Sequence, residues 1–205
     1  TCSGAGGHGL SEFFLQNQQG RIFWYMPIQA SAPDLPTFAY MGQIDGPTVP
    51  IVPPADTWVQ PRGLAVADFN GSFDGVQEVI AAFDSSSGGR LVYMAQDYFF
   101  GPNLYFWEDP FLLTLEDAGG DEIDPYLIEG VAATDYDRDG RTDLVLTLSD
   151  YTNYNVCTYH YFRNTYDPDT NTFWFLHDGE LSAPSNSDSS WNQWARMASF
   201  ADADT

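Results

Sequence analysis

The sequence predicts an all-β protein of three propeller-type blades, each made of four antiparallel strands, and three observations support this fold class. Gly and Pro, at 18 and 13 of 205 residues, interrupt short β-branched and aromatic runs that are typical of strands. No window of the sequence keeps a helical period. One strand-and-turn pattern recurs every 67 residues, and four short strands in a unit of this kind are typical of a propeller blade.

Three aspartates, Asp68, Asp135 and Asp202, set the repeat, because each lies 67 residues from the next. Each follows a strand of small residues and opens an Asp-x-Asp or Asp-x-Asn turn. We therefore expect three repeats and the start of a fourth loop. Their boundaries are 1–67, 68–134, 135–201 and 202–205.

The strands after each turn repeat as well. An acidic residue opens an apolar strand at 12–15, 78–81 and 143–146. The next strand is expected at 20–26, 89–94 and 157–162. An aromatic strand follows at 37–40, 104–107 and 172–175. With the small-residue strand before the turn, this makes four strands in each complete unit.

The loop between Asp135 and Asp143 has the spacing of a calcium site. Ca²⁺ binds oxygen donors, and this loop offers them at positions 1, 3, 5 and 9, with a main-chain carbonyl at position 7 and a Gly at the sharp turn. Without a cation, carboxylates at this spacing would repel one another. The predicted ligands are Asp135, Asp137, Asp139, the carbonyl of Arg141, and Asp143.

The other copies of the loop are less complete. The second copy inserts two residues and offers Asp68, Asn70, Asp74 and Glu78 as ligands. Asn70 also begins an N-glycosylation acceptor pattern, but we predict that its side chain points inward as a metal ligand. The first copy has no carboxylate before Glu12, so no complete site is expected there. The fourth loop begins with Asp202 and Asp204.

The motif that starts at Ala132, Ala-x-x-Asp-Tyr-Asp-Arg-Asp-Gly-Arg-x-Asp-Leu-Val-Leu, resembles the FG-GAP/VCBS repeat of integrin α-subunit propellers and many secreted microbial proteins. At the level of blades the resemblance covers essentially the whole chain, and its motif is most specific in the third repeat. It implies a Ca²⁺-stabilised, propeller-like array that serves adhesion, ligand display or assembly. It does not single out a ligand, because fold and function are separable.

The charge of the chain excludes some partners. Seven Lys and Arg against 29 Asp and Glu give a net charge of −22, which repels nucleic acid and anionic membrane surfaces. No apolar run approaches the ~20 residues of a membrane-spanning helix. A charge this negative indicates bound cations or a need to stay soluble, and we expect an extracellular protein. Cys2 and Cys157 either form a disulfide or stay as two separate buried thiols.

Catalytic motifs are missing from the sequence, so we expect a protein that is not an enzyme. His8, His160 and His177 lack HxH or HExxH spacing, and no transition-metal or zinc-hydrolase site is predicted from them. No G-x-S-x-G elbow occurs. Paired carboxylates can hydrolyse glycosides, and a polysaccharide-active enzyme is the enzymatic alternative, but the calcium loops already account for the best pairs.

Two segments are candidates for binding. The acidic stretch 108–124 is consistent with a further cation site, a sugar-binding rim or a solvated loop. Trp191 and Trp194 lie in a Ser- and Asn-rich stretch and are the best tryptophans for stacking on a sugar ring. Glycans are therefore possible partners.

The two ends of the chain carry the two halves of one expected hairpin, the strand at 197–204 and the strand at 12–15. Pairing between neighbouring subunits would cover both open edges, and contacts of this kind continue into a filament unless they close a ring. We expect a head-to-tail homo-oligomer or filament in an extracellular surface structure. The alternative is a carbohydrate-binding or adhesion propeller that is an excerpt of a longer chain.

Overall fold

The structure is a computed structural model, and every regular element in its described residues is a β-strand. The all-β prediction is therefore confirmed for the described part of the chain. The described residues are 13–16, 22–28, 37–44, 59–71, 78–85, 88–94, 96–98, 105–107, 111–123, 127–150, 153–167, 169–170 and 172–182.

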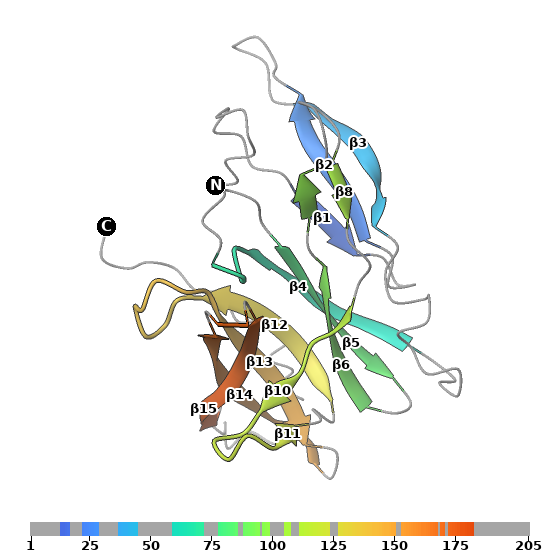
Figure 1. Cartoon of the computed structure of the whole chain (residues 1–205). Coiled ribbons are helices and arrows are strands. Elements are labelled where there is room, and N and C mark those ends of the chain that lie inside the picture. Colours follow the sequence, from blue (N-terminus) through green and yellow to red (C-terminus); the bar gives the residue numbers. More distant parts are fainter. Residues whose placement is uncertain are drawn as a thin grey trace.

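The first two sheets are antiparallel and follow the chain order (Figure 1). The first sheet consists of β1 (Phe13–Gln16), β2 (Ile22–Ile28) and β3 (Thr37–Ile44). The second consists of β4 (Val59–Ala67), β5 (Glu78–Ser85), β6 (Gly88–Met94) and β9 (Phe111–Leu112). A separate hairpin pairs β7 (Gln96–Tyr98) with β8 (Tyr105–Trp107).

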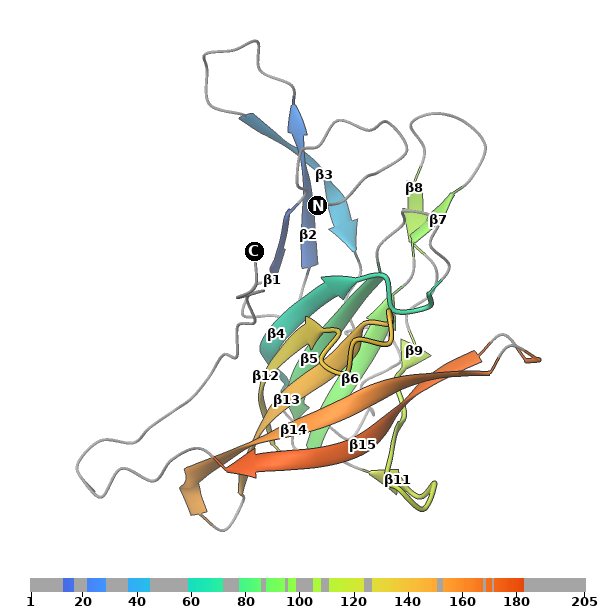
Figure 2. The same ribbon diagram turned by 90° about the vertical axis from the view of Figure 1, so that its left-hand side faces the viewer.

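The third sheet has six strands, and all but one of its pairings are antiparallel. The exception is β10, which runs parallel to β15. Figure 2 shows β14 and β15 side by side as a long hairpin, and they are 15 and 11 residues long. The order is β11 (Glu122–Ile123), β10 (Leu115–Glu116), β15 (Thr172–Ser182), β14 (Asn153–Asp167), β13 (Asp143–Asp150) and β12 (Ile128–Thr134).

The second and third sheets share one register around their loops. Ala67 pairs with Glu78 in the second sheet, and Thr134 pairs with Asp143 in the third. The aromatic strand expected at 104–107 corresponds to β8, but it pairs with β7, and β9 takes the fourth place beside β6. The loop that β8 closes by pairing with β7 is shorter than the loop that it would close by pairing with β6, so it costs less conformational entropy. The described strands form no closed barrel or propeller.

A β-bulge occurs at the same position of the repeat in β4 and in β12, and these two strands lie next to each other (Figures 1 and 2). The register shifts at Arg62 in β4 and at Glu129 in β12, and these two residues are 67 positions apart. Arg62 donates to Glu129 over 3.1 Å and to Asp84 over 3.1 Å, and Ser149 donates to the other Glu129 oxygen over 3.2 Å. The two matching bulges thus join one sheet to the other through a largely buried ion pair.

The hydrophobic core lies between these two sheets. Ile80 and Ala82 of β5 and Leu144 and Leu146 of β13 are fully buried. The ring of Phe69, in the loop after β4, packs edge-to-face on Phe175 of β15 with 6.1 Å between centroids. The rest of the core is Ala65, Leu91, Leu115, Ile128 and Phe162. The loop after β4 is therefore fixed to the core that the two sheets share.

Candidate metal centre

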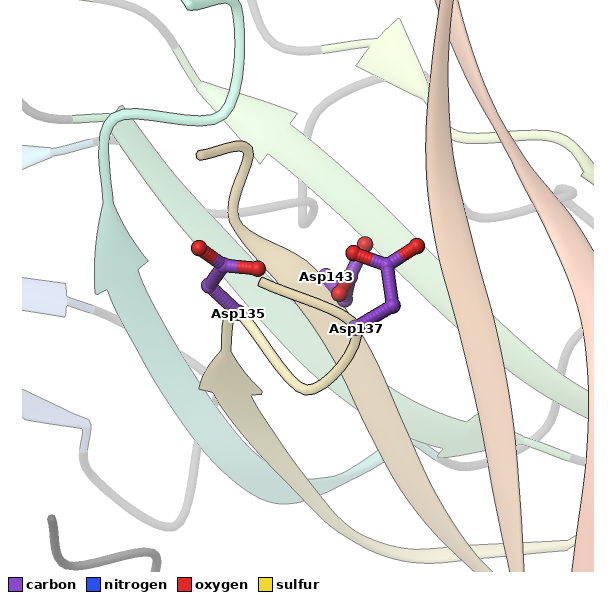
Figure 3. Close-up of side chains that lie close together, drawn as sticks. All are labelled: Asp135, Asp137 and Asp143. Carbon is purple, nitrogen blue, oxygen red and sulfur yellow. The ribbon is translucent and has the colours of Figure 1, made fainter. Parts of the chain in front are cut away.

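The loop between β12 and β13 brings together three of the predicted calcium ligands. Asp135 and Asp137 lie in the loop, and Asp143 is the first residue of β13. One carboxylate oxygen from each lies within 4.8 Å of the others. Figure 3 shows the three side chains around the turn of the loop. This acidic group can hold a metal ion.

Backbone N–H groups hold the carboxylates of the loop in place. Asp135 accepts hydrogen bonds from the N–H of Asp139 (3.1 Å) and of Gly140 (3.0 Å). Asp137 also accepts from Asp139, over 3.0 Å. Gly140 has a φ of 89°, a left-handed conformation that glycine adopts at little cost. The Gly of the motif is therefore required by the sharp turn, as the sequence predicted.

Asp143 is the buried member of the group, with 0% of its surface exposed. Its two oxygens accept hydrogen bonds from the N–H of Tyr136 (3.1 Å) and of Asn164 (2.8 Å). Burial raises the pKa of Asp143 to about 6, the two backbone hydrogen bonds oppose this, and repulsion from Asp137 and Asp139 adds to it. A cation beside this carboxylate would favour its charged form.

Two further predicted ligands, Asp139 and Arg141, lie in the same loop but outside the three-carboxylate group. An oxygen of Asp139 accepts a hydrogen bond from the N–H of Arg141 over 2.8 Å. The guanidinium of Arg141 lies 4.9 Å from the ring centroid of Tyr166, and it extends toward Gly71 in the neighbouring loop. The side chain of Arg141 thus connects the loop to its surroundings, and its predicted contribution to the metal is the carbonyl.

The loop between β4 and β5, which we call the second loop, uses the acidic residue at its end, Glu78, for hydrogen bonds within the loop. Glu78 is 1% exposed and accepts hydrogen bonds from the N–H of Phe69 (2.7 Å), the N–H of Asn70 (3.4 Å) and the amide of Asn70 (3.0 Å). Asp68 accepts from the N–H of Gly71 over 2.8 Å. Among the described residues, Asp68 and Glu78 belong to no acidic group that could hold a metal. Asp74 lies outside the described residues.

Asn164 is a residue of the site that the sequence analysis did not find. It is 2% exposed, and its side-chain amide donates to the carbonyl of Thr142 (3.0 Å) and to the carbonyl of Phe69 (2.6 Å). Since its backbone N–H also donates to Asp143, Asn164 connects the acidic loop to the second loop. It lies 21 residues beyond Asp143 inside a strand, and no motif marks it.

Several predicted features lie outside the described residues. These are Asp202, Asp204, Trp191, Trp194, Cys2 and the C-terminal half of the expected terminal hairpin. Within the described ranges, no helix has the length and apolar character needed to cross a bilayer.

Comparisons with protein-family models, with curated proteins and with solved structures found no match to this chain. The resemblance to the FG-GAP/VCBS repeat therefore rests on the residues of the loop and on the repeat, and it stays a prediction. The fold and the site define the molecule at this level as an all-β protein with an acidic loop between adjacent strands.

Proposed function

We propose that this chain is a calcium-stabilised, non-catalytic repeat module of an extracellular surface structure, and that it acts by assembly. The observation that carries the proposal is the group of Asp135, Asp137 and Asp143, whose oxygens lie within 4.8 Å of one another. The group connects two adjacent strands, so a cation bound there would act on the fold.

Calcium fits this group better than other common cations. All three side chains supply oxygen, which hard cations prefer, and Ca²⁺ tolerates irregular coordination by six to eight oxygens. Asp135 and Asp137 are exposed, so water can complete the coordination shell. Extracellular modules bind Ca²⁺ with a Kd of about 10⁻⁴–10⁻³ M. A partly open site of this kind suits that concentration range.

The cation would stabilise more than its own loop. Asp143 opens β13 and accepts the N–H of Asn164 in β14, and Asn164 in turn donates to Phe69 in the second loop. Cancelling the repulsion among the carboxylates therefore favours the arrangement of three segments at once. A stabilising role explains why the acidic residues gather at a junction between sheets.

The shared register of the second and third sheets supports blade-like repeats, because matching bulges at Arg62 and Glu129 place the same strand of each unit against the other. This contact joins equivalent strands of successive units within the chain, and head-to-tail contacts of such units with further copies would continue unless they closed a ring. On this ground we propose that the chain assembles with copies of itself.

The test is a thermal melt in Ca²⁺ and in chelator. At a free Ca²⁺ of 100 Kd, binding to the native state adds about 2.7 kcal/mol to the free energy of unfolding. We expect the Tm to fall in chelator and to recover when Ca²⁺ is restored. Asp137→Asn should lose most of this response. An unchanged wild-type melt in chelator would contradict the proposal.

A matched control is Asp169→Asn, which removes the same charge from an exposed turn between β14 and β15. This variant should keep the full response to Ca²⁺. The distribution of mass in analytical ultracentrifugation of the wild type, with and without Ca²⁺, tests assembly separately. A monomer under both conditions would overturn the assembly part and leave calcium binding standing.

A further inference from the structure

A bulge in β15 brings two histidines together that are 17 residues apart in the sequence. His160 of β14 pairs with Glu180, and Phe162 pairs with His177, so the register shifts by one residue at Asp178. In a regular strand His177 and Glu180, three residues apart, would point to opposite faces. The extra residue of the bulge places both on the face that carries His160.

The facing nitrogens of the two rings have the spacing of ligands that share one metal ion. His160 Nδ1 lies 3.1 Å from His177 Nε2, and the ring centroids are 5.3 Å apart. At metal–nitrogen distances of about 2.05 Å, this separation corresponds to an angle of roughly 100° at the metal. That angle lies between those of an octahedral and a tetrahedral site.

The remaining nitrogen of His160 has the partners that a metal-binding histidine usually has. Its Nε2 lies 2.8 Å from the hydroxyl oxygen of Thr158 and 3.9 Å from a carboxylate oxygen of Glu180. Oxygen partners on the outer nitrogen orient a ligating ring and increase its basicity. Burial lowers the pKa of His160, and the neighbouring His177 lowers it further, while Glu180 acts in the opposite direction. The neutral imidazole that binds metals is thereby favoured.

We propose that His160 and His177 form a site for a late first-row divalent metal of the copper–zinc class, separate from the acidic loop. Imidazole nitrogen suits these metals, and carboxylate oxygen suits calcium, so the two sites differ in chemistry. With both rings neutral, one proton lies between the facing nitrogens. When the metal binds, this proton moves to the outer nitrogen of the ring that carries it, so no net proton is released. Water fills the remaining coordination positions.

The experiment is a Cu²⁺ titration of the full chain in excess Ca²⁺, which occupies the acidic loop, followed by electron paramagnetic resonance. The wild type should bind one Cu²⁺ with nitrogen hyperfine couplings from two imidazoles. Even outer-shell partners change metal affinity by about 10–100-fold. His160→Gln and His177→Gln should each weaken binding at least that much and lose the two-imidazole signature.

The matched control is His8→Gln, which removes the third histidine of the chain, a residue outside the described ranges. It should bind Cu²⁺ like the wild type. Circular dichroism shows which variants are folded, and His177→Gln alone decides the question if His160→Gln does not fold. Wild-type affinity in a folded His177→Gln variant, or a wild type without a two-imidazole signature, would overturn the proposal.

Discussion

The loop after β4 and the loop after β12 begin alike and use their acidic residues in opposite ways. In both, the carboxylate that opens the next strand accepts the N–H of the aromatic residue after the first aspartate, Phe69 or Tyr136. Glu78 receives two further hydrogen bonds from Asn70 and is satisfied by its own loop. Asp143 instead lies beside Asp135 and Asp137. Among the described residues, the comparison teaches that the same acidic position can satisfy its own loop or join a group of carboxylates that could hold a metal ion.

The largest expected effect comes from Glu78→Ala. Removing this carboxylate leaves the buried N–H of Phe69 without the acceptor it has at 2.7 Å, and it also removes the two bonds from Asn70. We expect a loss of about 3 kcal/mol in the free energy of unfolding. The loss should be equal in Ca²⁺ and in chelator when measured by denaturant unfolding. A loss seen only in Ca²⁺ would mean that Glu78 is a metal ligand, as the sequence predicted.

The next effect is a pH dependence of stability that is present in chelator and largely absent in saturating Ca²⁺. The pKa of Asp143 in the folded protein is about 6, raised above its ordinary value of 3.8. In chelator, protonation therefore favours the folded state, and stability should fall as pH rises from 4 through 6. In Ca²⁺ the proton competes with the cation, so the Ca²⁺ affinity should fall by about tenfold per pH unit below 6.

Thermal melts between pH 4.5 and 7.5, with and without Ca²⁺, check this prediction. In chelator the stability should rise as the pH is lowered through 6, whereas in saturating Ca²⁺ it should stay nearly constant, because the loss of Ca²⁺ affinity offsets the gain from protonating Asp143. Parallel slopes would contradict the placement of Asp143 beside a bound cation. In Asp143→Asn the carboxyl group is gone, so the difference in slope should largely disappear.

A smaller effect is expected from Asn164→Ala, which removes the amide between the two loops but keeps the backbone N–H that donates to Asp143. Loss of hydrogen bonds to the carbonyls of Phe69 and Thr142 should cost about 1–2 kcal/mol. In the wild type, Ca²⁺ should slow amide hydrogen exchange in both loops. In the variant, the protection of Gly71 should no longer respond to Ca²⁺, while that of Gly140 still does.

The smallest effect is expected from Arg141→Lys. The guanidinium of Arg141 lies over the ring of Tyr166, 4.9 Å from its centroid, and a partly exposed contact of this kind contributes about 0.5–1 kcal/mol. Ca²⁺ affinity should stay the same, because the predicted ligand at this position is the main-chain carbonyl. A clear loss of affinity in calorimetric titration would assign the side chain a direct part in the site.

The sequence predicted the features that depend on neighbouring residues. Alternating Asp residues and Gly140 predicted the acidic loop, and the acidic residue before an apolar run predicted the start of β5 and β13. Asp139, which the sequence also predicted as a ligand, lies outside the group of three carboxylates, and one of its oxygens accepts the N–H of Arg141. A local backbone hydrogen bond of this kind is not visible in the spacing of carboxylates.

The features that the sequence did not predict depend on contacts between distant segments. β10 lies parallel to β15 through Leu115 and Phe175, which are 60 positions apart. Asn164 acts through its place beside two loops, and the histidine pair depends on a one-residue bulge at Asp178. A single shift in strand register changes which side chains meet, and residue type alone does not encode it.

The central claim, that the loop from Asp135 to Asp143 binds calcium and acts on its neighbour, is tested most directly by amide NMR during a Ca²⁺ titration. We expect saturable shifts at one equivalent of Ca²⁺ for Tyr136 and Gly140, followed in the same titration by Phe69 and Gly71 through Asn164. Asp137→Asn should lose both sets of shifts. Resonances of Tyr136 and Gly140 that stay unchanged to millimolar Ca²⁺ would contradict the account.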